Sequence, residues 1–342
     1  MSYTMKAVIA RNPGGPEVLQ YTEVERPVLR QPTDILVRVI AAGVNPGDCQ
    51  NRASGAPTYA ASEERPAFSI FGMDGVGVIE QVGDAITLLR PGDAVWYYDG
   101  GYADKHGSYA EYKVVDGRYV ARKPGSMDFV TAAALPVVGL TAWEAVVDRA
   151  AVREGDFVLV HGGAGGLGHI SIQLARRRGA RVAATVSSPE KARLARELGA
   201  ELVIDYRRSN VKQIITGWSG RDGADVVFDF VGRDNFAGSL DLVAPYGTLV
   251  NTVVADWPRG DNMIAEYKNI SIKFVNIGLP QVTGIPEFRA RQAAILAQLA
   301  GLVDQGALKV HLDRVYPLQE AAEAHRALEA GEIMGRVVLS IG

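Results

Sequence analysis

The chain has 342 residues, five histidines, one cysteine and a formal net charge of −3. This suits two domains with sizeable cores and predicts no nucleic-acid partner. No apolar stretch approaches the roughly 18–20 residues of a membrane span, and the N-terminus lacks the layout of a secretion signal, so we expect a cytoplasmic protein with no membrane partner. The single cysteine, Cys49, excludes an intrachain disulfide and the cysteine-based zinc sites, and no paired histidine spacing replaces them, so we expect no metal.

The first part of the chain consists of short β-rich segments separated by glycine and proline. Met1–Ala10 already has the pattern of a strand. Further strands are predicted at Ile35–Ala41, Gly75–Val82 and Ala94–Tyr97. The turns between them are strong breakers of regular structure. We therefore predict a compact, mostly β domain with long loops.

After this part, strands and helices alternate, with the clearest helix at Pro189–Leu198. Six strands joined by helices predict an α/β fold with a doubly wound parallel sheet, the Rossmann arrangement. A long amphipathic helix at Pro286–Gln305, a helix at Leu318–Ala330 and a last strand at Gly335–Ile341 follow. The six predicted strands are Phe157–His161, Arg181–Val186, Glu201–Asp205, Asp225–Phe230, Gly247–Val253 and Ile270–Ile277.

A glycine-rich turn lies between the first of these strands and the helix that follows it. The spacing G-x-G-x-x-G in this context brings free N–H groups and the positive end of a helix dipole to a pyrophosphate. A glycine turn without a ligand is the alternative. The residues predicted to bind a dinucleotide here are Gly163, Ala164, Gly165, Gly166, Leu167 and Gly168.

The second predicted strand ends at Ser187 and Ser188, where enzymes that prefer NAD usually carry an acid for the ribose 2′-hydroxyl. Lys191 follows in the first turn of the next helix. Hydroxyls and a lysine can donate to a 2′-phosphate, and two charged hydrogen bonds of roughly 1.5–3 kcal/mol each would favour NADPH by about two to four powers of ten. We therefore predict NADPH as the cofactor. An ordinary solvated lysine is the alternative reading of Lys191.

Four further segments occur in the order and at the separations of a known enzyme family. They are Gly43–Asp48 (GVNPGD), Pro66–Val78 with GMDGVG at its centre, Gly107–Tyr112 (GSYAEY) and Ala133–Ala142 (AALPVVGLTA). With the glycine turn, they make nearly the whole chain resemble the zinc-free quinone oxidoreductase branch of the medium-chain dehydrogenase/reductases, the group that includes zeta-crystallin. Zinc-containing relatives carry cysteine at the position of Asn45 and Gly-His-Glu at the position of Gly72-Met73-Asp74.

The resemblance implies a GroES-like catalytic domain formed from both chain ends, residues 1–127 and 279–342, around a Rossmann domain at 128–278. It implies a nicotinamide in the cleft between the domains and a homodimer that forms through the strand at 270–277. It also implies that Lys191, Tyr206 and Ser188 read the 2′-phosphate. The predicted cofactor-binding set outside the glycine turn is Ser187, Ser188, Lys191, Tyr206, Asn251 and Arg336.

Hydride transfer to a carbonyl acceptor needs stabilisation of the negative charge that develops on its oxygen. Candidates are Asn45, whose amide N–H₂ is directed at the nicotinamide or at the acceptor oxygen, and Thr141, through a hydroxyl at a helix start near the nicotinamide ring. A loop amide that satisfies its own backbone and a helix cap are the respective alternatives. Asp48 is expected to orient the loop rather than to donate a proton, and Arg336 to reach a cofactor phosphate or to cap the last strand.

The acceptor pocket is less defined by the sequence. Some quinone reductases carry a tyrosine two positions beyond the loop aspartate, where this chain has Gln50, and Arg52 and Tyr59 are the nearby substitutes. Cys49 is expected to be a small core residue. Tyr97, Tyr98 and Tyr102 are candidates for the pocket wall, with packing at the strand edge as the alternative.

The function that the sequence favours is NADPH-dependent hydride transfer to quinones or activated α,β-unsaturated carbonyls, without a metal. Two alternatives stay open. An enoyl-thioester reductase would need cations for the carrier phosphates, for which Arg52, Arg65 and Arg259 are candidates. A non-catalytic NADPH-binding protein of the crystallin type would bind the cofactor without turnover.

Overall fold

The computed structural model describes residues 3–55, 67–102, 105–232, 234–252 and 262–342. The chain divides into two compact units, Met1–Val137 with Gly278–Gly342, and Val138–Ile277. The N-terminal part of the first unit ends at Val137, ten residues beyond the predicted boundary at residue 127. The reason is that helix α2 (Phe129–Ala133) packs on strands of the β-rich unit and not on the parallel sheet.

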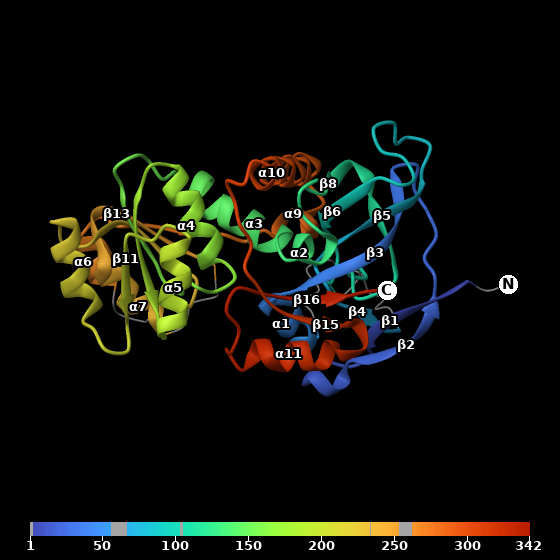
Figure 1. Cartoon of the computed structure of the whole chain (residues 1–342), viewed down its shortest axis with the longest axis horizontal. Coiled ribbons are helices and arrows are strands. Elements are labelled where there is room, and N and C mark those ends of the chain that lie inside the picture. The colour runs from blue at the N-terminus through green and yellow to red at the C-terminus, as the bar shows by residue number, and fades with distance from the viewer. Residues whose placement is uncertain (1–2, 56–66, 103–104, 233, 253–261) are drawn as a thin grey trace. The chain divides into compact units, whose positions relative to one another are not determined.

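The second unit is built on a six-stranded parallel sheet, in the order β11-β10-β9-β12-β13-β14. This order is that of the dinucleotide-binding doubly wound fold, and it confirms the predicted fold class. Helices connect the strands and pack along the sheet (Figure 1). The strands are β9 (Phe157–Val160), β10 (Arg181–Val186), β11 (Leu202–Asp205), β12 (Ala224–Asp229), β13 (Val243–Asn251) and β14 (Ser271–Phe274). The helices include α4 (Gly168–Arg177), α5 (Pro189–Glu197), α6 (Val211–Ser219), α7 (Asn235–Leu242) and α8 (Asn262–Tyr267).

The strands of this sheet read as apolar runs because helices cover them. Leu159, Ala183 and Val227 from three neighbouring strands form one core with Phe236 of α7. Strand β13 begins four residues before the predicted Gly247. Its first residue pairs with Ala224 across an irregular register, and Tyr246 inside it has a positive φ of 62°. The sequence Pro245-Tyr246-Gly247 therefore has the composition of a turn although it lies within a strand.

The first unit contains a seven-stranded sheet and a three-stranded sheet. All their strand pairs are antiparallel except β15–β16, which confirms a mostly β domain. Strand β16 pairs with β3, so the two ends of the chain build one sheet. The larger sheet contains β3 (Asp34–Val44), β5 (Asp74–Val82), β6 (Ala94–Tyr98), β7 (Tyr112–Asp116), β8 (Ala121–Arg122), β15 (Leu312–Pro317) and β16 (Arg336–Ser340). The smaller sheet contains β1 (Thr4–Ala10), β2 (Gln20–Glu25) and β4 (Ser69–Ile70).

Helices occupy the connections of this unit. The predicted helix at Leu318–Ala330 is split into a 3₁₀ turn, η4, and the helix α11. Strand β3 runs directly into helix α1, which begins after Asn45, so the candidate catalytic loop lies where a central strand ends. The helices are α1 (Pro46–Ser54), α9 (Leu279–Thr283), α10 (Pro286–Asp304) and α11 (Ala321–Glu329), with the short turns η1 (Pro16–Val18), η2 (Gly117–Tyr119) and η4 (Leu318–Glu320). Helix α3 (Pro136–Trp143) and a π-helical turn, η3 (Glu144–Arg149), lead into the second unit.

Candidate functional site

The glycine turn closes tightly against strand β10. The amide of Gly163 donates to the carbonyl of Thr185 at 3.0 Å, and that of Gly165 donates to the carbonyl of Gly162 at 2.8 Å. A Cβ atom at Gly163 would lie 2.6 Å from the Cβ of Ala184, and one at Gly168 would lie 2.2 Å from the oxygen of Gly162. These two glycines are therefore required by the turn itself.

Gly165 has a different environment. A Cβ built on it would meet only one heavy atom within 4 Å among the described residues, the oxygen of Gly162 at 3.2 Å. The turn therefore has no packing partner over this residue, and here a ligand can approach the bare backbone. In the dinucleotide-binding turn the middle glycine has this role, so the residues present fit a pyrophosphate. Of the other predicted turn residues, Ala164 is buried and Gly166 and Leu167 are half-buried.

The predicted 2′-phosphate residues lie together at the ends of β10 and β11. The amide of Tyr206 donates to the carbonyl of Val186 at 3.3 Å, which brings it beside Ser187. Ser188 caps helix α5, since its hydroxyl accepts from the amide of Lys191 at 3.3 Å. The ring of Tyr206 is 51% exposed.

Two charged residues near this place were missed in the sequence. A hydrogen bond from its own backbone amide, and next a hydrogen bond with the hydroxyl of Ser188, lower the pKa of the Glu190 carboxyl. The guanidinium of Arg207 lies 6.0 Å from the centre of the Tyr206 ring. Their positions in the sequence, beside Lys191 and Tyr206, were the signal that could have identified them.

Asn251 is the last residue of β13 and is fully buried. It lies opposite Asp229, the last residue of β12. Asp229 holds the turn that follows, because its Oδ1 accepts from the amides of Val231 and Gly232 at 3.0 and 2.9 Å. The carboxyl ends of the central strands thus carry fixed polar groups, as a ligand-binding edge of such a sheet requires.

In the first unit, Asn45 lies at the centre of a buried polar network. Its amide nitrogen donates to Asp48 Oδ2 at 3.2 Å and to Asp74 Oδ1 at 3.0 Å, and its Oδ1 accepts from Arg336 Nη2 at 2.7 Å. Only 1% of the residue is exposed. Both amide hydrogens of Asn45 are therefore committed to carboxylates, and this geometry contradicts an amide directed at the acceptor oxygen.

Asp48 ties the same loop to the turn before β5. Its Oδ1 accepts from the amides of Gly72 and Met73 at 3.0 and 3.1 Å, and its Oδ2 accepts from the amide of Asn45 at 2.9 Å. Burial and the neighbouring charge of Asp74 raise the pKa of Asp48 to about 7, against the effect of these hydrogen bonds. Both oxygens of the Asp48 carboxyl group accept hydrogen bonds from the surrounding chain, so Asp48 has the geometry of a residue that holds the loop in position.

Arg336 is used within this network, and its predicted role at a cofactor phosphate is wrong. The guanidinium is buried, with Nε donating to the carbonyl of Ala134 at 2.8 Å and Nη2 bound to Asn45. Burial raises the pKa of Asp74, and the charge of Arg336 partly offsets that rise. One guanidinium thus compensates the buried Asp74, so its removal would leave an unpaired charge.

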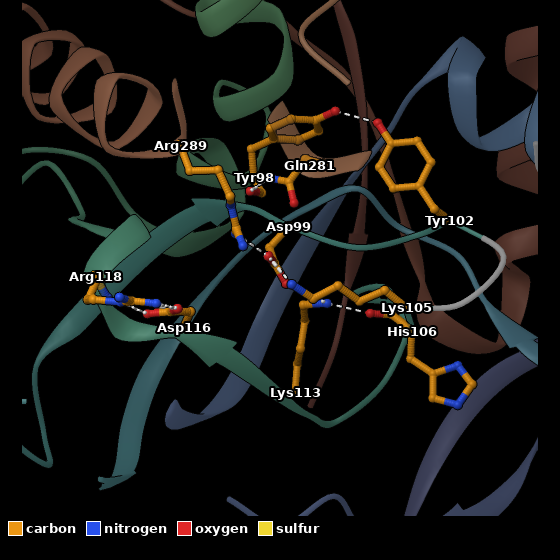
Figure 2. Close-up of polar contacts among 10 residues, drawn as sticks. All are labelled: Tyr98, Asp99, Tyr102, Lys105, His106, Lys113, Asp116, Arg118, Gln281 and Arg289. Atoms are coloured by element: carbon orange, nitrogen blue, oxygen red, sulfur yellow. Dashed lines mark hydrogen bonds and ion pairs between the residues drawn. The ribbon is translucent and has the colours of Figure 1, made fainter. Parts of the chain in front are cut away.

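The helix-cap reading of Thr141 is also wrong. Thr141 lies well inside α3, which begins at Pro136, and it is buried. Tyr97 does not form a pocket wall, because it is fully buried in the core of the larger sheet, where its hydroxyl accepts from Ser108 at 3.4 Å. Tyr98 and Tyr102 do come together through their hydroxyls (Figure 2). Tyr59, Arg65 and Arg259 lie outside the described residues.

Arg52 is neither a pocket residue nor a phosphate ligand, since it is buried in a second network. Its Nη2 pairs with Glu329 at 2.6 Å and its Nη1 lies 3.2 Å from His325 Nδ1. Because arginine only donates, Nδ1 of His325 accepts, and Nε2–H donates to the hydroxyl of Tyr109 at 3.1 Å. Burial, with the charge of Arg52, lowers the pKa of His325 to about 3.

Asp74, Tyr109 and His325 belong to these networks and were not identified as site residues from the sequence. Tyr109 packs against the turn that Asp48 holds: a Cβ at Gly72 would lie 2.5 Å from its ring. Over the part of the chain that the structure describes, no group of three or more His, Cys, Asp or Glu residues could hold a metal ion. Nor is any described helix both long and apolar enough to cross a bilayer.

Comparison with known proteins identifies the class of protein first. Residues 31–125 match the alcohol dehydrogenase GroES-like domain, and residues 198–339 match a family described as zinc-binding dehydrogenase. The chain is 34% identical over 330 residues to a quinone oxidoreductase of Pseudomonas aeruginosa, covering 95% of this chain and 96% of the relative. It is 30% identical over 337 residues to a 2-haloacrylate reductase of a Burkholderia species, covering 98% of each.

A mycobacterial protein solved in complex with NADPH has the same fold, with a TM-score of 0.84 and 30% identity over 98% of this chain and 99% of that one. These matches define an oxidoreductase with a GroES-like and a Rossmann domain. The chain belongs to the medium-chain dehydrogenase/reductase superfamily, in its quinone oxidoreductase branch, and the predicted family is confirmed.

Proposed function

We propose that the protein is an NADPH-dependent reductase that transfers hydride to quinones or activated α,β-unsaturated carbonyls, without a metal ion. The observation that carries this proposal is the bare backbone at Gly165, in the turn between β9 and α4, where a Cβ would meet a single heavy atom of the described residues within 4 Å. A pyrophosphate there would contact free amides at the start of a helix. The mycobacterial relative solved with NADPH supports the cofactor, and the 2-haloacrylate reductase supports an activated alkene as acceptor.

The preference for NADPH rests on the ends of β10 and β11. Ser187 follows β10, Tyr206 follows β11 and Lys191 lies in the first turn of α5, and we assign these three residues to the ribose 2′-phosphate; no acid stands at the end of β10. Arg207, whose guanidinium lies 6.0 Å from the centre of the Tyr206 ring, adds a second cation. Glu190 opposes an anion there, so Lys191 and Arg207 must outweigh it. Asn251, at the end of β13, stays a proposed cofactor contact.

A bound NADPH would supply a hydride, and this hydride with one proton from the solvent accounts for the reduction of a quinone to a hydroquinone, with NADP⁺ as the oxidised product. The chain's own part is to hold the reacting groups in place. Asn45 and Asp48 fix the loop after β3 through buried hydrogen bonds, and we assign both to positioning. Thr141 remains the proposed hydroxyl at the acceptor.

We also propose a homodimer through the edge strand β14. In the described chain β14 pairs only with β13, and Phe274 on it is about half exposed. The unpaired backbone groups along such an edge can form hydrogen bonds with the same strand of a second chain. A single buried cysteine suits the reducing cytoplasm, which we propose as its location.

The test is oxidation of NADPH followed by its absorbance, with 1,4-benzoquinone, an enal and an enoyl thioester as acceptors. The proposal predicts turnover with the quinone or the enal and slower turnover with NADH. Turnover confined to the thioester would replace it with an enoyl-thioester reductase. Tight NADPH binding without turnover on any acceptor would leave a protein of the crystallin type.

A further inference from the structure

Three cations converge on one buried carboxylate in the first unit (Figure 2). Asp99, which follows β6, is 2% exposed. Its Oδ1 lies 2.6 Å from Lys105 Nζ and 2.6 Å from Arg289 Nη2, and its Oδ2 lies 3.4 Å from Lys113 Nζ. These four residues, called the Asp99 cluster, come from three segments: the connection after β6 (Asp99 and Lys105), strand β7 (Lys113) and helix α10 (Arg289).

The charges of the Asp99 cluster do not balance. Although burial alone would raise it, the three cations lower the pKa of Asp99 to about 2, so this carboxyl group is ionised. Burial and the like charges nearby lower the pKa of Lys113 only to about 8, so the lysine is mostly charged at neutral pH. The neighbouring Asp116 is occupied by Arg118 at 2.6 Å. The three cations exceed the one carboxylate by two charges, but Lys105 is partly exposed to water. The buried cations, on Lys113 and Arg289, exceed the buried carboxylate by one, and a charge held away from water calls for a counter-ion.

The arrangement also contains buried polar atoms without a partner. Among the described residues, Arg289 Nε and Gln281 Oε1 have no hydrogen bond, although the side chain of Arg289 is only 10% exposed. Gln281 itself is fixed, because its Nε2 donates to the carbonyl of Tyr98 at 2.7 Å. Arg289 Nε is a buried donor without an acceptor beside the positive charge of the cluster, which indicates a missing acceptor such as an anion. Gln281 Oε1 is an acceptor, and only a donor would satisfy it.

A single residue, Met73, links the Asp99 cluster to the loop that contains Asn45 and Asp48. The amide of Asp99 donates to the carbonyl of Met73 at 2.8 Å, and the amide of Met73 donates to Asp48 at 3.1 Å. Helix α1, which follows Asn45, is also bound to the segment after Asp99, because Asn51 of this helix donates to the carbonyl of Gly101 at 3.2 Å. The hydroxyls of Tyr98 and Tyr102 meet beside this cluster (Figure 2).

We propose that the Asp99 cluster is an anion subsite that binds a carboxylate on the acceptor, with Lys105 as the residue that meets it. The side chain of Lys105 is 41% exposed, whereas those of Lys113 and Arg289 are buried behind it, so Lys105 is the arm that an incoming anion can reach. The buried cations add to its field in surroundings of low dielectric constant. This inference rests on the proposed function, because it names the kind of enone that the enzyme prefers: one with a free carboxylate.

The experiment compares two acceptors that differ only in charge, 3-benzoylacrylate and its methyl ester. In the wild-type enzyme kcat/KM should favour the acid, and added salt should reduce the preference because it screens the attraction. In Lys105→Gln the acid-to-ester ratio of kcat/KM should fall about tenfold, the effect of one charged hydrogen bond. Lys105→Arg should keep the ratio. Lys6→Gln, the same change of charge at a surface ion pair with Glu23, should leave it unaltered.

A second measurement does not depend on turnover. The reduced acid, 3-benzoylpropionate, should raise the Tm of the wild-type protein and of Lys6→Gln, but not that of Lys105→Gln. If the enzyme reduces the ester and the acid equally, or if Lys105→Gln lowers both rates alike, the cluster is only a structural anchor and the proposal is overturned. A preference for an acyl thioester over the free acid would also overturn it, in favour of carrier phosphates. Binding of the acid through Lys105 without turnover would retain the subsite and reject the proposed function.

Discussion

The two candidate sites of this protein are built in opposite ways. In the second unit the glycine turn offers backbone, and at its central residue, Gly165, a Cβ would meet no side chain of the described residues within 4 Å. In the first unit the polar groups of Asn45, Asp48 and Asp74 already bind one another and are buried. The first kind of site gains its contacts when a ligand arrives, whereas the second is complete beforehand and holds a loop in place. Substitutions should therefore affect ligand affinity in the turn and folding stability in the network.

The largest effect on stability is expected when the carboxyl group of Asp48 is removed from the buried network. Asp48→Ala leaves the buried amides of Asn45, Gly72 and Met73 without their acceptor. Several unsatisfied buried donors should lower the free energy of unfolding by about 3–5 kcal/mol, measured by denaturant titration. Asp84→Ala, on an exposed loop, is the matched control and should stay within about 0.5 kcal/mol of the wild type. A small loss in Asp48→Ala would mean that the network does not hold the loop.

The turn should respond in affinity instead. Gly165→Val places a side chain over the backbone at which the pyrophosphate would arrive, and should raise the Kd for NADPH at least about 100-fold. The circular dichroism spectrum should match that of the wild type, because little of this chain lies near that side chain. Gly217→Val on α6, where nothing lies within 4 Å of a new Cβ, should bind NADPH normally. Unchanged affinity in Gly165→Val would show that the turn serves another purpose.

A smaller effect sharpens the comparison within the second unit. Lys191→Ala should weaken NADPH binding about tenfold and NADH binding less than about twofold, because only NADPH carries the phosphate. Glu190→Gln removes the opposing charge from the same helical turn and should tighten NADPH binding. Both shifts are measured by fluorescence titration of the reduced coenzymes. Equal losses for both coenzymes in Lys191→Ala would remove the assignment of the 2′-phosphate.

The smallest effect concerns pH and the first unit alone. The pKa of His325 is lowered from 6.5 to about 3, so its contribution to stability is present above pH 6.5 and is lost as the pH falls. Between about pH 7.5 and 5.5 the stability difference between the wild type and His325→Gln should shrink by about 1 kcal/mol.

Asp48, with its pKa raised to about 7, acts in the opposite direction, but it does so in both proteins and cancels in the difference. Denaturant titrations of both proteins at several pH values give this difference. A constant difference over this range would contradict a buried, neutral His325.

The sequence predicted the fold and the turn because both depend on local patterns. Strand β10 has its predicted bounds, and the glycines Gly163, Gly165 and Gly168 of the turn lie within six residues of the chain. Where local composition misleads, the prediction fails: Pro245-Tyr246-Gly247 has turn composition, yet β13 passes through it with Tyr246 at positive φ. Irregularities of this kind are fixed by pairing with β12, which a local pattern does not contain.

The network of the first unit was only partly predictable. Asn45 and Asp48 were found because they share a short motif, but their partners Asp74 and Arg336 are 29 and 291 residues from Asn45 along the chain. Without those partners, the amide of Asn45 looked available for an acceptor and Arg336 looked available for a phosphate. Burial of both removes these roles, and burial is set by the packing of β3 against β5 and β16.

The most direct test is calorimetric titration of the intact, purified wild-type protein with NADPH and, separately, with NADH. The geometry at Gly165, Lys191 and Tyr206 predicts one binding event per chain for each coenzyme, with NADPH bound at least about tenfold more tightly. Absence of heat for both coenzymes, or tighter binding of NADH, would contradict the account.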